Sequence, residues 1–171
     1  MKLFKLILAF LLFSFSGPVL GSEKASFYTV DMNKLLKQTA VGKKLISDNN
    51  SLKQSLQNEN DALQAELLLE EKDLSELRSS LSADEFRPKA LAFDQKVTII
   101  RLEQAQKEEN LLRDIRKKES DFYKNIYPLL YKLLSERGGL ILLDQRNVVL
   151  WDSSVDITDE AIDMINRIYE Y

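Results

Sequence analysis

The sequence predicts a mainly α-helical protein in which a long helical hairpin, with coiled-coil-like arms, projects from a small oligomerising β-sheet domain. Two apolar series support this fold class. In the first, leucines lie seven and four residues apart, with mostly charged and amide residues between them: Leu45, Leu52, Leu56, Leu63, Leu67 and Leu74. The second series ends before Gly138-Gly139: Phe93, Val97, Ile100, Leu111, Ile115, Phe122, Ile126, Leu129 and Leu133. This spacing is typical of two amphipathic helices, each roughly 60 to 80 Å long.

The first 21 residues are typical of a secretory signal peptide. Lys2 and Lys5 precede an uncharged apolar run, which ends before Ser16-Gly17-Pro18 and the small-residue pattern Val19-Leu20-Gly21. The apolar run is shorter than the roughly 20 residues that span a bilayer, so a membrane anchor is the weaker interpretation. We therefore predict an exported protein that is cleaved after about Gly21.

Composition narrows the function classes. Residues 1–21 hold two of the 24 basic residues and none of the 27 acidic ones, so residues 22–171 have 22 basic against 27 acidic residues, a formal charge of −5. A mildly acidic chain argues against nucleic acid as a partner. Histidine and cysteine are absent, which removes the commonest general base, the thiol nucleophile, the best transition-metal ligands and any disulfide. We expect neither enzymatic activity nor a cofactor.

Residues 22–42 are predicted to form the first part of the β-body. Ala25–Asp31 is rich in aromatic and β-branched residues, which favours a strand. A short helix over Met32–Thr39 would follow, with Asp31 as its N-cap. We expect Val41-Gly42 to loosen the chain before the helical-hairpin arm, which we place at residues 43–137.

The arm is expected to turn near Ser79–Ser82. Ser82 and Glu85 match a capping box, which predicts the start of the second helix. Pro88 follows, so this helix either begins at Pro88 or is kinked there, and Pro128 predicts a second bend. Further along the helix, basic residues have acidic neighbours at helical spacing, which favours a solvated helix face over an anion site: Arg113, Arg116, Lys117 and Lys118.

Residues 138–171 are predicted to complete the β-body. Gly138-Gly139 ends the arm, because glycine accepts the left-handed backbone that often follows a helix. Two apolar segments, Leu140–Leu143 and Val148–Trp151, flank a polar turn and predict a β-hairpin. A final helix over Thr158–Tyr169 would have Thr158 as its N-cap and present one apolar side: Ile162, Ile165 and Ile168.

The predicted hairpin strands are apolar on both faces, so both faces of the sheet must be covered. A body this small is only marginally stable alone. We therefore expect several subunits to share one core through the sheet. The candidate oligomerisation residues are apolar residues of the predicted strands: Phe27, Val30, Leu140, Leu142, Val149 and Trp151.

The order of these parts resembles the Skp family, also called the OmpH family, of periplasmic chaperones. The resemblance depends on Val30-Asp31-Met32, on Pro128 in the returning helix, and on three C-terminal motifs: Gly138–Asp144, Val148–Trp151 and Asp156–Asp159. It implies a homotrimer with a central β-body. Three helical hairpins project from this body and surround a cavity. In this family the cavity holds unfolded outer-membrane proteins during their transit, without ATP.

The charge departs from the family's pattern. The best-known members are strongly basic, which helps them to capture acidic clients and to contact lipopolysaccharide or phospholipid. The acidic balance of this chain gives no indication of peripheral membrane contact. We expect the client to be contacted instead by apolar residues that lie partly off the main stripes: Leu68, Leu69, Leu91, Phe93 and Ile99.

Two other function classes stay open beside the leading hypothesis, an ATP-independent periplasmic holdase for unfolded outer-membrane proteins. An envelope scaffold or adaptor would use the same rods to bind one folded partner. An enzyme is the third class. Asp152, Asp156 and Asp159 suggest a calcium site, but they lack the spacing of an EF-hand loop, and turn or capping roles explain Asp156 and Asp159.

Overall fold

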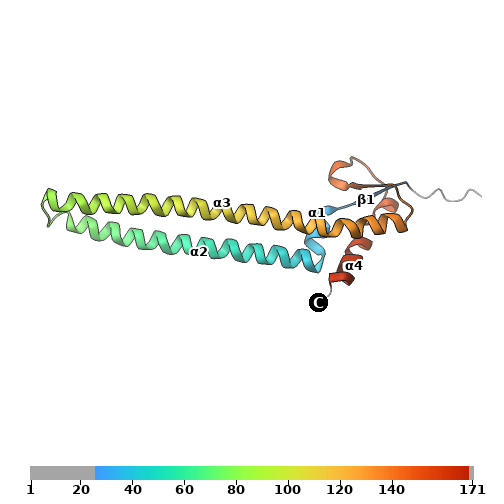
Figure 1. The fold of residues 1–171 in the computed structure, drawn as a ribbon, viewed down its shortest axis with the longest axis horizontal. Coiled ribbons are helices and arrows are strands. Elements are labelled where there is room, and N and C mark those ends of the chain that lie inside the picture. The colour runs from blue at the N-terminus through green and yellow to red at the C-terminus, as the bar shows by residue number, and fades with distance from the viewer. Residues whose placement is uncertain (1–25, 170–171) are drawn as a thin grey trace, which may run out of the picture.

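A computed structural model describes residues 26–169 and confirms the predicted fold class. Two long helices, α2 (Ala40–Leu77) and α3 (Ala83–Glu136), lie side by side and antiparallel, and together form the arm (Figure 1). The other elements gather at one end of the arm, which we call the body: β1 (Phe27–Val30), α1 (Met32–Gln38), β2 (Ile141–Asp144), the 3-10 turns η1 (Gln145–Asn147) and η2 (Ser153–Val155), and α4 (Thr158–Tyr169). The predicted signal peptide, residues 1–21, lies outside the described residues.

The sheet of the body joins two segments from opposite ends of the chain. β1 pairs with β2 in parallel, in a register that runs from Phe27 opposite Ile141 to Val30 opposite Asp144. On the other side of β1, Thr29 bridges to Asp156, and the Ile157 N–H donates to the Thr29 carbonyl at 3.0 Å. β1 is therefore flanked on both sides, whereas within residues 26–169 the ladder pairs β2 only with β1.

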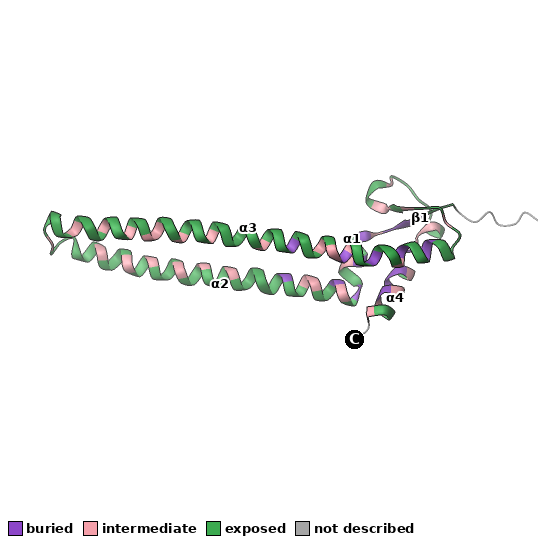
Figure 2. Cartoon of the chain, in the orientation of Figure 1, coloured by how far each residue is buried: buried purple, intermediate pink, exposed green. Residues whose placement is uncertain are grey.

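The hydrophobic core lies in the body and not in the arm. Figure 2 shows buried residues concentrated at the body end, while most of the arm is exposed or intermediate. Side chains from four elements meet there almost without solvent contact, among them Val30 of β1, Leu35 of α1, Ile126 of α3 and Ile165 of α4. Along the arm, most leucines of the first stripe are only half-buried, so the seam between α2 and α3 is a marginal apolar contact.

Three predicted helix ends are confirmed. The Asp31 carboxylate accepts a hydrogen bond from the Lys34 N–H at 3.0 Å and caps α1. Ser82 and Glu85 form both bonds of the capping box at the start of α3. Gly138, with φ of 69°, occupies the left-handed region just after α3. Short sequence motifs thus predicted the ends of these helices correctly.

The arm begins earlier than predicted, at Ala40 instead of Lys43. The Thr39 hydroxyl accepts from the Gly42 N–H at 3.1 Å and donates to the Leu35 carbonyl at 2.7 Å, so Thr39 links the end of α1 to the start of α2. Gly42 is buried in the first turn of α2 and does not loosen the chain. A Cβ there would lie 2.1 Å from the Leu36 carbonyl oxygen, so the close approach of the two helices requires glycine.

The prolines do not interrupt α3. The helix begins at Ala83 and contains both Pro88 and Pro128, so the alternative that it starts at Pro88 is wrong. Pro88 lies in the second turn of α3, where it cannot donate to the Asp84 carbonyl, but the residues after it continue the helix. At the other end, apolar packing in the body holds the helix on both sides of Pro128, where Ile126 and Leu130 are buried.

The predicted hairpin does not form: Leu140–Leu143 contributes most of β2, but Val148–Trp151 is not a strand. The Asp144 carboxylate accepts from the Arg146 N–H at 3.1 Å and from its guanidinium at 2.6 Å, and the Val148 N–H donates to the Gln145 carbonyl at 3.1 Å. These local bonds wind residues 145–147 into η1. The chain therefore leaves β2 through η1 and not through a hairpin turn, and Val148–Trp151 does not pair with the free edge of β2 in the described chain.

The final helix spans the predicted residues, but Thr158 is not its N-cap; Thr158 is the first helical residue. Its hydroxyl accepts from the Asp31 N–H at 2.9 Å and donates to the Asp156 carboxylate at 2.5 Å. It therefore ties α4 to the N-terminal segment instead of capping its own helix. On the predicted apolar side, Ile162 and Ile165 are buried, whereas Ile168 is half exposed.

We predict that Gly139→Ala destabilises the body. A Cβ at this position would lie 2.4 Å from Leu134 Cδ1 and 2.5 Å from the Tyr28 ring, inside the core. Such overpacking should lower the free energy of unfolding by about 1 to 3 kcal/mol. Urea denaturation followed by circular dichroism, at one protein concentration, measures the change. The exposed helical control Ser47→Ala should not lower stability, and an unchanged midpoint for Gly139→Ala would contradict the prediction.

Candidate functional site

The body exposes a group of large apolar side chains around the β2 edge. Val149 and Leu150 are 92% and 87% exposed, and Leu140 is 78% exposed. Phe27, Ile141, Leu143 and Trp151 add to this surface. An edge strand beside exposed apolar residues is a template for pairing with another chain, and clusters of this kind mark interaction surfaces. We call these seven residues the body surface.

Next to the body surface lies a groove of about 320 Å³ between β2 and α3. Leu142 and Leu130 contribute to its apolar wall, and Tyr127 and Tyr131 stand at its rim, where they are 54% and 72% exposed. Tyrosine combines a large apolar ring with a polar tip, which suits a partly wet interface. The tyrosine groove therefore extends the body surface along the base of α3.

The arm presents apolar side chains that point away from the seam. Leu68 and Leu69 on α2, and Leu91, Ile99 and Leu102 on α3, are between 56% and 65% exposed. Leu68 and Leu69 are adjacent, and Ile99 and Leu102 lie one turn apart, but charged and amide residues are interspersed along each helix, so the surface consists of small separate apolar contacts. Such a surface can contact an apolar chain at many points without selecting a single sequence.

Ion pairs bridge the two helices of the arm. Lys96 Nζ lies 2.9 Å from Glu66 Oε1 and 2.6 Å from Glu70 Oε2, and Lys107 pairs with Glu59. Hydrogen bonds to Glu70 and Glu66 raise the pKa of Lys96, and a hydrogen bond from Lys107 lowers the pKa of Glu59. These side chains are partly exposed to water, so the pairs align the helices more than they stabilise them.

The comparison with known families assigns the chain. The model of the family described as outer membrane protein (OmpH-like) matches residues 26–165. The chain belongs to this OmpH-like family. The match spans both the arm and the body, so the resemblance seen in the sequence is confirmed over almost all the described residues.

A solved structure shares the fold of this OmpH-like chain. It is the crystal structure of a candidate outer membrane chaperone (OmpH-like) from Caulobacter crescentus CB15, with a TM-score of 0.79 and 18% sequence identity. The similarity covers 90% of this chain and 89% of that one. No curated protein matches the chain. The arm-and-body arrangement is thus retained at low sequence identity.

The structure distributes the predicted oligomerisation residues unevenly. Phe27, Leu140, Val149 and Trp151 belong to the body surface, and Leu142 lines the tyrosine groove. Val30 is 2% exposed and belongs to the hydrophobic core, so it lies at the bottom of the same groove and adds almost no exposed surface. Sequence reasoning missed Tyr127 and Tyr131. Their spacing of four residues, out of phase with Phe122, Ile126 and Leu130, could have indicated a second face of α3.

Among the predicted client-contact residues, Leu68, Leu69, Leu91 and Ile99 are exposed, as their positions off the stripe suggested. Phe93 is half-buried, because it is in helical phase with Val97 and Ile100 of the seam. Leu102 was missed. It follows Leu91 by eleven residues, the same interval that separates the seam leucines, and so lies on the same side of α3 as Leu91.

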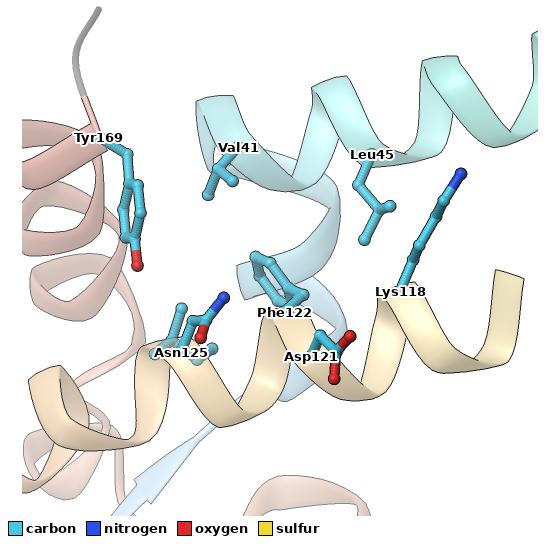
Figure 3. Close-up of a pocket in the computed structure, with 8 residues that line it drawn as sticks. Val41, Leu45, Lys118, Asp121, Phe122, Asn125 and Tyr169 are labelled. Atoms are coloured by element: carbon cyan, nitrogen blue, oxygen red, sulfur yellow. The ribbon is translucent and has the colours of Figure 1, made fainter. Parts of the chain in front are cut away.

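A separate cavity of about 230 Å³ lies where the arm meets the body (Figure 3). Val41 and Leu45 of α2 and Phe122 of α3 form an apolar wall, and Tyr169 reaches toward them from α4. Asn125 stands at the rim. Close by, the Ala40 N–H donates to Asn166 Oδ1 at 2.8 Å, so α4 secures the first turn of α2. This junction holds the arm at its base.

Several of the charged residues singled out in the sequence have local structural partners. In the basic cluster, Arg113 pairs with Glu109 at 3.7 Å and Lys117 with Asp121 at 2.7 Å, as expected for a solvated helix face. Asp152 caps η2 by accepting from the Ser154 N–H, and Asp156 accepts from Thr158. Within residues 26–169, no group of three potential metal ligands comes together, and none of the described helices is long and apolar enough to cross a membrane.

Asp156 is the charged centre of the link between η2, α4 and the N-terminal segment. Burial acts to raise the pKa of Asp156, but hydrogen bonds from the Thr158 hydroxyl and N–H outweigh it and hold the pKa below the ordinary value of 3.8. The unfolded chain therefore takes up protons first as pH falls. The stability that the carboxylate contributes is present above pH 3.8 and is lost as pH falls through the lower, folded value.

We predict that Asp156→Asn lowers the melting temperature at pH 7 and that the difference from the unmodified protein shrinks below about pH 4. The amide oxygen still accepts from Thr158 but carries no charge, so the variant isolates the ionic contribution. Thermal melts between pH 3 and pH 7 measure this difference. Asp163→Asn, at an exposed position of α4, is the control, and a difference that grows as pH falls would contradict the assignment.

Proposed function

We propose that the chain is an ATP-independent holdase that binds unfolded outer-membrane proteins in the periplasm and prevents their aggregation. The observation that carries the proposal is the set of exposed leucine and isoleucine side chains on a projecting arm, in a chain of the OmpH-like family. The solved relative from Caulobacter crescentus CB15 is itself described as a candidate outer membrane chaperone. A signal peptide over residues 1–21 would deliver the chain to the periplasm.

The chemistry of the arm suits an unfolded β-barrel chain. Strands of such a barrel alternate apolar and polar residues and expose unpaired backbone groups until the barrel closes. Exposed apolar residues such as Leu68, Leu91 and Ile99 would cover part of that apolar surface. The charged residues between them keep the arm itself soluble and leave the client free to dissociate. Binding of this kind requires no nucleotide.

Capture by this chain would depend little on charge. Residues 22–171 carry a formal charge of −5, and the arm mixes both signs along its length. Long-range steering needs a field of one sign, which the arm lacks. We therefore propose no lipopolysaccharide or phospholipid site, and we expect client affinity to change little with ionic strength.

We further propose that the chain assembles as a homotrimer through the body, with the three arms enclosing a cavity. The body surface and the adjacent tyrosine groove support this assembly, because they leave a strand edge and several large apolar side chains open to water in the single chain. Burial of such a surface against identical subunits would remove it from solvent. Arms anchored in one trimeric body would then act on the same client.

We predict that serine at Leu68, Leu69, Leu91 and Ile99 together weakens client binding about tenfold or more, because each lost apolar contact removes part of the burial energy. The measurement is the chaperone concentration that keeps a urea-denatured outer-membrane barrel from scattering light after dilution. A control with serine at the exposed polar positions Gln95 and Gln106 should hold the client normally. If the unmodified protein fails to keep the barrel soluble at stoichiometric ratios, the holdase proposal is wrong, and capture of one folded partner would favour the scaffold alternative.

We predict that Val149→Asp combined with Leu150→Asp converts the trimer to a monomer. Both positions are almost fully exposed in the single chain, so the charges should not unfold the subunit, but they would be costly in an apolar interface. Light scattering behind a sizing column gives the absolute mass, and circular dichroism checks the fold. Leu102→Asp, on the arm, should leave the mass unchanged. A mass unaffected by the double substitution would place the interface elsewhere.

A further inference from the structure

The seam of the arm contains buried polar side chains at regular positions. In α2 the seam follows an eleven-residue repeat, and Asn49 and Asn60 occupy equivalent positions in two consecutive repeats, between the leucines. Asn49 is only 5% exposed, and Asn60 is half-buried. Across the seam, Gln104 of α3 is also half-buried. The contact between the two helices therefore alternates apolar and amide layers.

The oxygens of these amides have no hydrogen-bond partner in the described protein. Asn49 Oδ1, Asn60 Oδ1 and Gln104 Oε1 are all inaccessible to solvent and unpaired. A buried acceptor that lacks a donor destabilises the packing around it. The closed seam thus leaves three strong acceptors unsatisfied, and two of them lie at one level of the arm.

Asn60 and Gln104 belong to a groove of about 450 Å³ that runs along the middle of the arm. Leu63, Leu67 and Ile100 form its apolar part. The groove therefore places two unpaired acceptors beside an apolar wall. A ligand that matches it must offer hydrogen-bond donors and an apolar side chain within a short distance.

Weak ion pairs flank this groove at both ends. Lys107 and Glu59 pair next to Gln104 and Asn60, and Lys96 joins Glu66 and Glu70 on the side toward the tip. All these side chains are between 37% and 61% exposed, so water screens the pairs and little energy opposes their separation. The helices are held in register around the groove but are not locked together.

We propose that this mid-arm groove is a binding subsite for an extended polypeptide, reached when α2 and α3 separate locally. Backbone N–H groups of the client donate to Asn60 Oδ1 and Gln104 Oε1, and one of its apolar side chains lies against Leu63, Leu67 and Ile100. An unfolded chain fits because it carries unpaired N–H donors at every residue except proline, whereas a folded protein has already paired most of its own. This inference depends on the proposed holdase function and adds recognition of backbone to it.

A cross-link across the seam tests whether separation is required. The chain has no cysteine, so Glu59→Cys with Lys107→Cys gives a single reactive pair that a short bismaleimide can join. We expect the cross-linked protein to bind a urea-denatured outer-membrane barrel about tenfold more weakly than the same variant capped with a monofunctional maleimide. The matched control joins Lys44→Cys to Asp48→Cys within α2, where the native side chains lie 3.0 Å apart and no seam is bridged. That staple should have no effect.

The outcomes separate this inference from the holdase proposal. Equal binding by the cross-linked and capped proteins would overturn the subsite while leaving the holdase function intact. Failure of the unmodified protein to bind the barrel would instead remove the function on which the subsite depends. Weaker binding by the cross-linked protein alone, with the α2 staple unaffected, supports the subsite.

Substitution of the acceptors gives an independent test. Asn60→Leu with Gln104→Leu replaces the amide layer by an apolar one, so we expect a higher melting temperature of the arm together with about tenfold weaker client binding. Greater stability with weaker binding distinguishes loss of the acceptors from simple unfolding. Unchanged or tighter client binding would overturn the inference, since apolar burial alone would then account for capture.

Discussion

The parallel pairing of β1 with β2 is the constraint on which the rest of the molecule depends. These strands come from opposite ends of the chain, and their register places Phe27 beside Ile141. The long segment that follows α1 must therefore leave the body and return to it before β2. Because that intervening chain is almost wholly helical, the return path is an antiparallel pair of long rods, and the arm follows from the closure of a two-stranded sheet.

The body and the arm are stabilised in different ways. In the body, buried side chains from β1, α1, α3 and α4 pack around Leu35 and Ile165, and the Asp156–Thr158–Asp31 hydrogen bonds tie α4 to the N-terminal segment. The arm has half-buried leucines, partly exposed ion pairs and buried amide oxygens without hydrogen-bond partners. A closely packed body with a weakly held arm agrees with the holdase function proposed above, in which the arm contacts the client.

Local signals in the sequence predicted the features that local chemistry decides. Ser82 with Glu85, Asp31 and Gly138 each mark a helix end through bonds or backbone angles within a few residues. The leucine spacing likewise predicted the arm, because helical periodicity belongs to the helix itself. Phe93 was placed both in the second apolar series and among the client-contact residues, and its half-buried position agrees with the series.

The errors occurred where distant parts of the chain compete. Val148–Trp151 has the composition of a strand, but a strand also needs a partner, and within the described residues β2 pairs with β1, from the other end of the chain, and not with this segment. Thr158 has the chemistry of an N-cap, but its hydroxyl bonds to Asp31 from the other end of the chain. Val30 could not be told from Val149 by residue type, although Val30 is buried in the core of the body and Val149 is almost fully exposed. These assignments depend on tertiary contacts.

The unbroken course of α3 has a mechanical consequence. The helix extends over 54 residues, about 80 Å at the rise of an α-helix, and runs from the tip of the arm through its base into the core. In contrast, α2 begins at the base of the arm, at Ala40, directly after its N-cap Thr39. A sideways force on the tip of the arm therefore acts as a torque at its base. The contacts between the last turns of α3 and the rest of the body resist this torque. Tyr127 and Tyr131 lie in these last turns, so a movement of the tip of the arm would be transmitted through α3 to the tyrosine groove beside β2.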